Sequence, residues 1–375
     1  MRRWLILSDS FKGTLSSRTI CRIACEAAPM FDGELAALPV ADGGEGTVDC
    51  FAAACGGTLV HETVCGPFPG ETLRAAYALL PGGTAVVECA SCAGLPLVAG
   101  RADPVRTTTF GVGELLRRAV ERGARRVILG LGGSCTNDGG CGAAAALGVR
   151  FYDAQGRAFV PVGGTLHRIA RIDTDEARAL LRGVEVTAMC DIDNPLYGES
   201  GAAHVFAPQK GADAQTVALL DEQLRALSAV ITRTLGLDVA QLSGAGAAGG
   251  FGAGCVAFLG ARLQSGIETV LDTVGFDVLA QQSELVITGE GRLDAQSLRG
   301  KVVSGVARRC AAVGTECFAL VGALDADEMA LHAVGLSGAR SINPTGASYA
   351  DACAHAPEYY AAALRALIRE RGAAK

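Results

Sequence analysis

The feature that most constrains the fold of this 375-residue chain is the alternation of strands and helices at both of its ends. The opening elements are an apolar strand at 4–8, a helix at 17–28, a strand at 35–40 and a helix at about 47–55. Alternation resumes at residue 284 and continues to a terminal helix at about 359–370. This pattern is typical of a parallel sheet covered by helices.

The middle of the chain has a different pattern of predicted elements. Short predicted strands at 58–64, 73–80 and 85–89 are joined by turns rich in Gly and Pro, which indicates an antiparallel meander. We therefore expect two domains. Residues 1–65 and 280–375 would form one discontinuous, doubly wound domain, and residues 66–279 an inserted α/β domain.

Composition excludes several classes of protein. A formal charge of −6 gives no indication of nucleic-acid binding or of an anionic membrane surface. The four-residue apolar run at the N-terminus is too short for a signal peptide. Fourteen cysteines without such a signal favour reduced thiols and a cytoplasmic location, and the five scattered histidines have no metal-ligand spacing.

Five polar, glycine-rich segments follow predicted strands, where open α/β sheets bind their ligands. They are residues 9–14, 42–47, 130–140, 190–196 together with 206–212, and 288–294 leading to Gly300-Lys301. Each is a candidate site loop on position alone.

The residue types of these segments suit anions and divalent cations. Asp42 and Glu45 are oxygen donors suited to Mg²⁺ or to orienting a hydroxyl, although helix capping also explains them. The small residues of 130–140 let backbone N–H groups approach a phosphate or a sugar acid. Asp191 and Asp193 share one face of an extended segment.

Lysine usage points to the same segments. Only four of the 33 basic residues are Lys, and the three internal ones, Lys12, Lys210 and Lys301, all lie in these segments or at their end. The compact ammonium differs from the planar guanidinium in a crowded phosphate site, which favours retention of Lys there.

Two familiar patterns are weak. Residues 244–249 match G-x-G-x-x-G, but no clear strand precedes them, so we interpret 244–261 as a glycine-rich loop and a buried helix. Gly300-Lys301 lacks the Ser/Thr and the first Gly of a P-loop.

Taken together and in order, the motifs resemble the bacterial glycerate kinase family, in its two-domain, glycerate 2-kinase type. The motifs are DSFKGTLSS, ADGGEGT, GLGGSCTNDGG, CDIDNPL, FAPQKGA, GAGAAGG and GEGRLDAQSLRGK. Cys135 stands where Ala is usual and Ala207 where Gly is common, and neither departure removes a charged group.

The resemblance implies a Rossmann- or flavodoxin-like domain, an inserted smaller mixed α/β domain and an active site in the cleft between them. It implies phosphorylation of D-glycerate by ATP with Mg²⁺, generally at the 2-hydroxyl, giving 2-phosphoglycerate and ADP. The partners would be these small molecules only.

Residue type and motif membership suggest roles. Asp191 would receive or orient the hydroxyl proton, with Asp42 as the rival, and Asp193 and Glu45 would bind Mg²⁺. Arg292 and Asp294 would bind glycerate. The predicted phosphate- and nucleotide-binding residues are Ser10, Lys12, Gly132, Gly133, Ser134, Asn137, Lys210, Gly289 and Lys301.

Three alternatives remain. One is an NAD-linked oxidoreductase that uses residues 244–249, and another is a non-catalytic sensor of a sugar acid. The third is a kinase of the same fold that gives 3-phosphoglycerate or phosphorylates another small hydroxy acid.

Overall fold

The computed structural model describes residues 2–11, 13–41, 43–294 and 302–371. The chain divides into two compact units. One comprises Gly43–Gly266, and the other is formed by the chain before and after it. The predicted boundaries, 65/66 and 279/280, both lie later in the chain than the observed ones. The inserted unit is the larger of the two, so the expectation that it would be the smaller was wrong.

The discontinuous unit contains a five-stranded parallel sheet with the order β16-β14-β12-β1-β2. The strands are β1 (Arg3–Ser8), β2 (Glu34–Pro39), β12 (Leu285–Gly289), β14 (Glu316–Val321) and β16 (Gly338–Ser341). Numbered within the unit, this is the flavodoxin-like order 2-1-3-4-5, which reverses direction between β1 and β12. A two-stranded ladder, β13 (Arg292–Leu293) with β15 (Ala323–Leu324), lies beyond the ends of β12 and β14.

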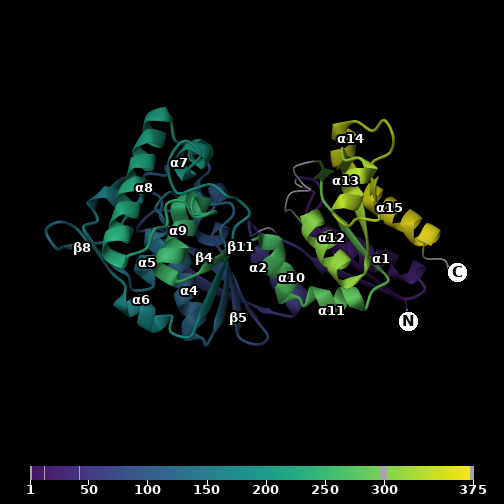
Figure 1. Ribbon diagram of the computed structural model, residues 1–375, viewed down its shortest axis with the longest axis horizontal. Coiled ribbons are helices and arrows are strands. Elements are labelled where there is room, and N and C mark those ends of the chain that lie inside the picture. Colours follow the sequence, from purple (N-terminus) through teal and green to yellow (C-terminus); the bar gives the residue numbers. More distant parts are fainter. Residues whose placement is uncertain (1, 12, 42, 295–301, 372–375) are drawn as a thin grey trace. The chain divides into compact units, whose positions relative to one another are not determined.

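Helices cover this sheet, and in Figure 1 the purple N-terminal elements and the yellow-green C-terminal elements form one body. The helices are α1 (Ser17–Ala27), α10 (Gly266–Thr273), α11 (Phe276–Gln281), α12 (Val302–Val313), α13 (Glu328–Ala333), α14 (Tyr349–Ala354) and α15 (Ala356–Arg371), with a 3₁₀ turn at Ala28–Met30. Ser16 caps α1 by accepting a hydrogen bond from the Thr19 amide at 3.1 Å. Trp4, Ile6 and Tyr360 are among the buried side chains that join β1 to its covering helices.

The inserted unit contains a mixed six-stranded sheet with the order β11-β10-β6-β5-β4-β3. Its strands are β3 (Thr58–Cys65), β4 (Thr72–Leu80), β5 (Thr84–Glu88), β6 (Arg126–Gly130), β10 (Glu185–Met189) and β11 (Arg262–Gln264). The predicted meander is confirmed, because β3, β4 and β5 pair antiparallel. From β5 to β11 all neighbours are parallel.

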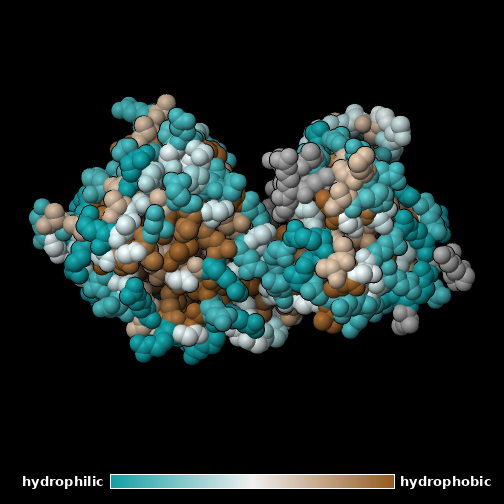
Figure 2. All heavy atoms as spheres, viewed as in Figure 1, coloured by the Kyte–Doolittle hydropathy of each residue, from teal (hydrophilic) through white to brown (hydrophobic). Residues whose placement is uncertain are grey.

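The remaining elements complete the inserted unit around this sheet. They are α2 (Thr47–Cys55), α3 (Ala90–Ala93), α4 (Phe110–Glu121), α5 (Cys141–Ala146), α6 (Asp175–Leu180), α7 (Ala202–Phe206), α8 (Ala214–Leu235), α9 (Ala247–Leu259), a small sheet of β7 (Arg150–Tyr152), β8 (Ala158–Phe159) and β9 (Arg171–Asp173), and 3₁₀ turns at Leu95–Val98, Gly163–Arg168 and Pro208–Lys210. The glycine-rich stretch does lead into a buried helix, α9, as the sequence predicts. Figure 2 shows hydrophobic residues reaching the surface where Figure 1 places α4, α5 and α9.

Candidate active site

Three of the five predicted segments converge within the inserted unit. The parallel strands β5, β6 and β10 end at the same edge of the sheet, and the segment that leads into α2 lies against the loop after β6. The Gly132 amide donates to the Gly43 carbonyl at 2.9 Å, and the Cys89 amide donates to the Gly130 carbonyl at 2.8 Å. The segments that begin after Asp42, Leu129 and Met189 therefore form one strand-end cluster.

Glycine is required where the first two of these segments meet. A Cβ on Gly130 would lie 2.4 Å from the Gly43 carbonyl oxygen, and one on Gly132 would lie 2.7 Å from the Gly44 Cα. Real side chains do not tolerate such distances, so the two backbones pack directly on each other. The Gly132 amide, which we expected to be available to a ligand, is engaged here by protein. Gly133 is exposed.

A buried lysine supports the loop that follows β6. The Lys210 ammonium donates to the Ser134 hydroxyl at 3.0 Å and to the Thr136 carbonyl at 2.7 Å, and the residue is 2% exposed. Burial lowers its pKa from 10.5 to about 8, opposed by nearby thiols and the Asp138 carboxylate. No described carboxylate forms an ion pair with this ammonium within 4 Å.

The same loop contains buried polar atoms that have no hydrogen-bond partner within the described residues. Asn137 is fully buried, and neither its amide oxygen nor its amide nitrogen has a hydrogen-bond partner within the described chain. The Thr136 hydroxyl is in the same state. Buried polar groups are nearly always satisfied, so these atoms indicate a place for water or a ligand.

Two buried carboxylates that were not among the predicted site residues, Asp138 and Glu88, hold this cluster in place. Asp138 accepts hydrogen bonds from the Thr109 amide and hydroxyl at 2.8 and 2.9 Å and from the amides of Gly140 and Gly142 at 3.0 and 3.2 Å. It thus binds the N-termini of both α4 and α5. Glu88 accepts from the Val48 amide at 3.0 Å at the start of α2.

Both carboxyl groups have pKa values that burial raises above the ordinary range. A sequence signal did exist for Glu88, because it ends an otherwise apolar strand. Asp138 lies inside a motif quoted above, but nothing in its spacing shows that it faces inward.

The acidic candidates of this unit lie nearer the solvent. Asp191 is exposed, and its carboxylate accepts hydrogen bonds from the Ser265 hydroxyl at 2.9 Å and the Gly266 amide at 2.8 Å. Asp193 and Glu45 are also exposed. Among the described residues no group of three or more His, Cys, Asp or Glu side chains is arranged to hold a metal ion.

The other two segments meet in the discontinuous unit, at the reversal between β1 and β12. The Asp9 amide donates to the Gly289 carbonyl at 2.9 Å, and the Asp9 carboxylate accepts from the Ser10 amide at 2.7 Å. Gly289 is pressed against the Leu320 carbonyl, where a Cβ would lie 2.0 Å away. Glu290 is 6% exposed. This is a second strand-end cluster, at the position where flavodoxin-like sheets bind ligands.

Both predicted substrate-binding residues, Arg292 and Asp294, lie beside this second cluster. Arg292 is on the exposed side of β13, and its Nε donates to the Asp325 carboxylate at 2.6 Å. Asp294 is half-buried. Three further predicted residues, Lys12, Asp42 and Lys301, lie outside the described residues.

The G-x-G-x-x-G segment serves packing. No strand precedes it, and a Cβ on Gly249 would lie 2.0 Å from the Thr136 carbonyl oxygen. Ala248 has a left-handed φ of 52°, an uncommon conformation for alanine that begins a left-handed run of three residues. These residues press α9 against the site loop, which explains their small size without a dinucleotide.

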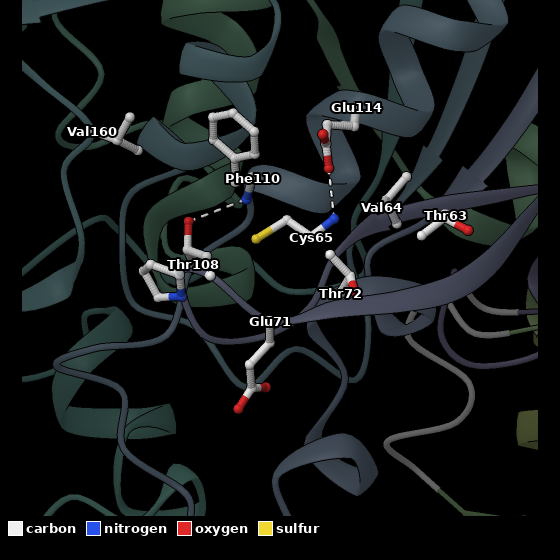
Figure 3. A pocket seen from close by; sticks show the side chains of 11 residues that line it. Thr63, Val64, Cys65, Glu71, Thr72, Thr108, Phe110, Glu114 and Val160 are labelled. Carbon is white, nitrogen blue, oxygen red and sulfur yellow. Dashed lines mark hydrogen bonds between the residues drawn. The ribbon is translucent and has the colours of Figure 1, made fainter.

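A cavity of about 380 Å³ lies elsewhere in the inserted unit, between the β3–β4 hairpin and the start of α4 (Figure 3). Its charged lining residues are Glu71 and Glu114, and the Glu114 carboxylate accepts from the Cys65 amide at 2.6 Å. None of the predicted site residues line it. An acidic and apolar lining is poorly suited to an anionic substrate.

The sequence model of the Glycerate kinase family matches residues 4–371. The chain belongs to the glycerate kinase family. Among curated relatives, the glycerate kinase of Bacillus subtilis is 41% identical over 359 residues, covering 95% of this chain and 94% of that protein. The glycerate 2-kinase of Escherichia coli is 41% identical over 342 residues, covering 90% of each chain.

A solved structure extends the family relationship to the fold. A crystal structure from Salmonella typhimurium LT2, whose protein has the provisional name glycerate kinase 2, superimposes with a TM-score of 0.85 and 38% identity, covering 98% of both chains. The two-unit α/β fold expected from the resemblance is therefore confirmed. As a member of this family the protein is a kinase. No helix in the described ranges is long and apolar enough to cross a membrane.

Proposed function

We propose that this glycerate kinase transfers a phosphoryl group from ATP to the 2-hydroxyl of D-glycerate, giving 2-phosphoglycerate and ADP. The observation that carries the proposal is the loop after β6, where the buried Asn137 amide has no hydrogen-bond partner within the described residues and the Lys210 ammonium holds the adjacent backbone. An unsatisfied buried amide is costly, and a small hydroxy acid bound there would satisfy it. The name of the Escherichia coli relative supports the 2-position.

Phosphoryl transfer needs alignment of the acceptor hydroxyl and neutralisation of phosphate charge rather than covalent chemistry by the protein. In our proposal Asp191 orients the acceptor hydroxyl and takes its proton. The hydrogen bonds from Ser265 and Gly266 fix the direction of this carboxylate. Asp42 remains the rival for this role.

Asp193 and Glu45 would hold Mg²⁺, which neutralises phosphate charge when bound. Two exposed carboxylates fit this ion, because Mg²⁺ binds few protein ligands and keeps several waters. Ser134 and Asn137 would contact substrate oxygens, and Ser10, Gly133 and Gly289 the phosphates of the nucleotide. Lys12 and Lys301 keep their predicted phosphate roles, and Arg292 and Asp294 their substrate roles.

The test is one reaction of the purified protein with ATP, Mg²⁺ and D-glycerate, followed by ³¹P NMR. The spectrum distinguishes 2-phosphoglycerate from 3-phosphoglycerate, and an enolase-coupled assay without mutase checks the 2-isomer. Absence of both phosphoglycerates would refute the proposal. Formation of the 3-isomer, or phosphorylation of another small hydroxy acid alone, would establish the alternative kinase.

A further inference from the structure

Lys210 was predicted from its motif to bind phosphate, but its surroundings indicate another role. It ends the 3₁₀ turn Pro208–Lys210, and its side chain is enclosed beneath the loop that follows β6. Two of its three ammonium donors are used by Ser134 and Thr136, at 3.0 and 2.7 Å. The contact joins residues 74 positions apart in the sequence, so it is a tertiary link between two motifs.

Within the described residues, no carboxylate forms an ion pair with this lysine. The titratable groups that face it are the Cys89 and Cys135 thiols and the Asp138 carboxylate. Burial raises the pKa values of both thiols, so they are neutral near pH 7. Asp138 is occupied by four donors from Thr109, Gly140 and Gly142. The ammonium therefore acts mainly through its two hydrogen bonds to the loop.

We infer that Lys210 is a positioning residue, whose protonated side chain fixes the Ser134–Thr136 backbone and thereby aims Ser134 and Asn137 at the substrate. The inference rests on the proposed function in that it places this loop at the acceptor site. The protonated ammonium donates to both acceptors at once, and its charge strengthens both hydrogen bonds. Deprotonation to the uncharged amine removes that charge and weakens them. Misplacing a substrate-positioning group by about 1 Å costs roughly 100-fold in rate.

This role predicts that activity and the stability contributed by Lys210 change in opposite directions with pH. The pKa of Lys210 is about 8 in the folded protein and 10.5 in the reference state. Activity should fall as pH rises through about 8, because the loop loses its clamp. Between these two values the unfolded chain binds more protons than the folded one, so the contribution of Lys210 to stability rises with pH.

The experiment compares wild type with Lys210→Met, Lys210→Arg, Ser134→Ala and the double variant Lys210→Met/Ser134→Ala, using Arg118→Met as a control for loss of an exposed cation. We expect Lys210→Met to lose about 100-fold in kcat/KM for D-glycerate and to lack the alkaline decline near pH 8. Lys210→Arg, if folded, should keep part of the activity without that decline, because guanidinium stays charged. Arg118→Met should resemble wild type.

The double variant distinguishes positioning from direct contact. If Lys210 acts through the loop, the double variant should be no worse than the more damaged single variant, whereas effects that multiply would show that Lys210 touches substrate and would overturn the inference. A loss below about threefold in Lys210→Met would overturn it too.

Hydrogen exchange supplies a readout that needs no activity. The amides of residues 135–137 should exchange faster in Lys210→Met than in wild type at pH 7, while α8 stays protected. Unchanged exchange would refute the clamp even if glycerate is phosphorylated. Faster exchange in a protein that does not phosphorylate glycerate would refute the proposed function and leave the clamp standing.

Discussion

The two strand-end clusters of this molecule are built in opposite ways. In the inserted unit the loop after β6 is interior: Lys210, Asn137 and Asp138 are all buried, and the chain's own ammonium and carboxylate hold the backbone. In the discontinuous unit Ser10 is half-buried and Arg292 lies at the surface, paired with Asp325. A preorganised site requires buried polar groups that cost stability, and the loop after β6 contains three consecutive ones, Thr136, Asn137 and Asp138. Substitutions in the two clusters should therefore differ in how much they change activity and how much they change stability.

The largest expected effect tests which cluster contains the general base. Asp191→Asn should lower kcat by about 1,000-fold, since general-base contributions are typically ~10²–10⁴-fold. Asp294→Asn, beside the other cluster, should raise the KM for glycerate more than it lowers kcat. Both are measured by steady-state kinetics with thermal melting as the fold control. Near-normal turnover of Asp191→Asn would leave Asp42 as the base.

The next effect is on stability. Asp138→Ala removes the acceptor for four hydrogen bonds at the starts of α4 and α5, and should lower the free energy of unfolding by about 3 kcal/mol. Asp9→Ala, its counterpart in the discontinuous unit, should cost about 1 kcal/mol. Urea denaturation measures both. Equal losses of unfolding free energy would mean that these two carboxylates stabilise their clusters to the same extent.

The same variant carries a pH prediction. Burial raises the pKa of Asp138 above 3.8, so between 3.8 and that raised pKa the folded protein binds more protons than the unfolded chain. The stability that Asp138 contributes must therefore fall as pH rises through this window. The difference in unfolding free energy between wild type and Asp138→Ala should shrink accordingly.

A third comparison uses two buried polar side chains whose polar atoms have no partner within the described chain, one in each cluster. Asn137→Leu should reduce kcat/KM by about 100-fold without lowering the melting temperature, because an apolar group replaces unsatisfied polar atoms. Thr288→Val makes the corresponding change within β12, the neighbour of β1, and should reduce activity less than tenfold. If Asn137→Leu destabilises the protein while activity per folded molecule is retained, Asn137 is structural.

The smallest expected effect concerns charge that serves the fold of the discontinuous unit. Arg309 on α12 pairs with Glu268, Asp272 and Asp277 at 2.7–3.0 Å, and these carboxylates raise its pKa. Arg309→Ala should cost about 1–2 kcal/mol in unfolding free energy, a loss that salt diminishes. Arg22→Ala, which breaks the exposed pair with Glu26, should cost under about 0.5 kcal/mol.

Much of the fold was predictable because buried strands of this chain are short apolar runs bounded by glycine-rich turns. β1, β2 and β5 lie within one residue of their predicted ranges. The grouping of the five segments into two clusters was not predictable, since it depends on which strands pair across more than 200 residues. Likewise, no local pattern shows that Lys210 reaches Ser134 or that Asp138 faces inward rather than toward solvent.

The strand pairing of the discontinuous unit has a consequence for synthesis of the protein. β1 pairs with β12 through contacts such as Trp4 with Leu285, so the central ladder of this sheet cannot form until some 280 residues have left the ribosome. The inserted unit has all its strands between Thr58 and Gln264 and is complete earlier. At roughly 5–20 residues per second, the N-terminal strand waits on the order of ten seconds or more for its partner. During that interval the edge of β1 that later pairs with β12 is unpaired, and such exposed strand edges favour aggregation.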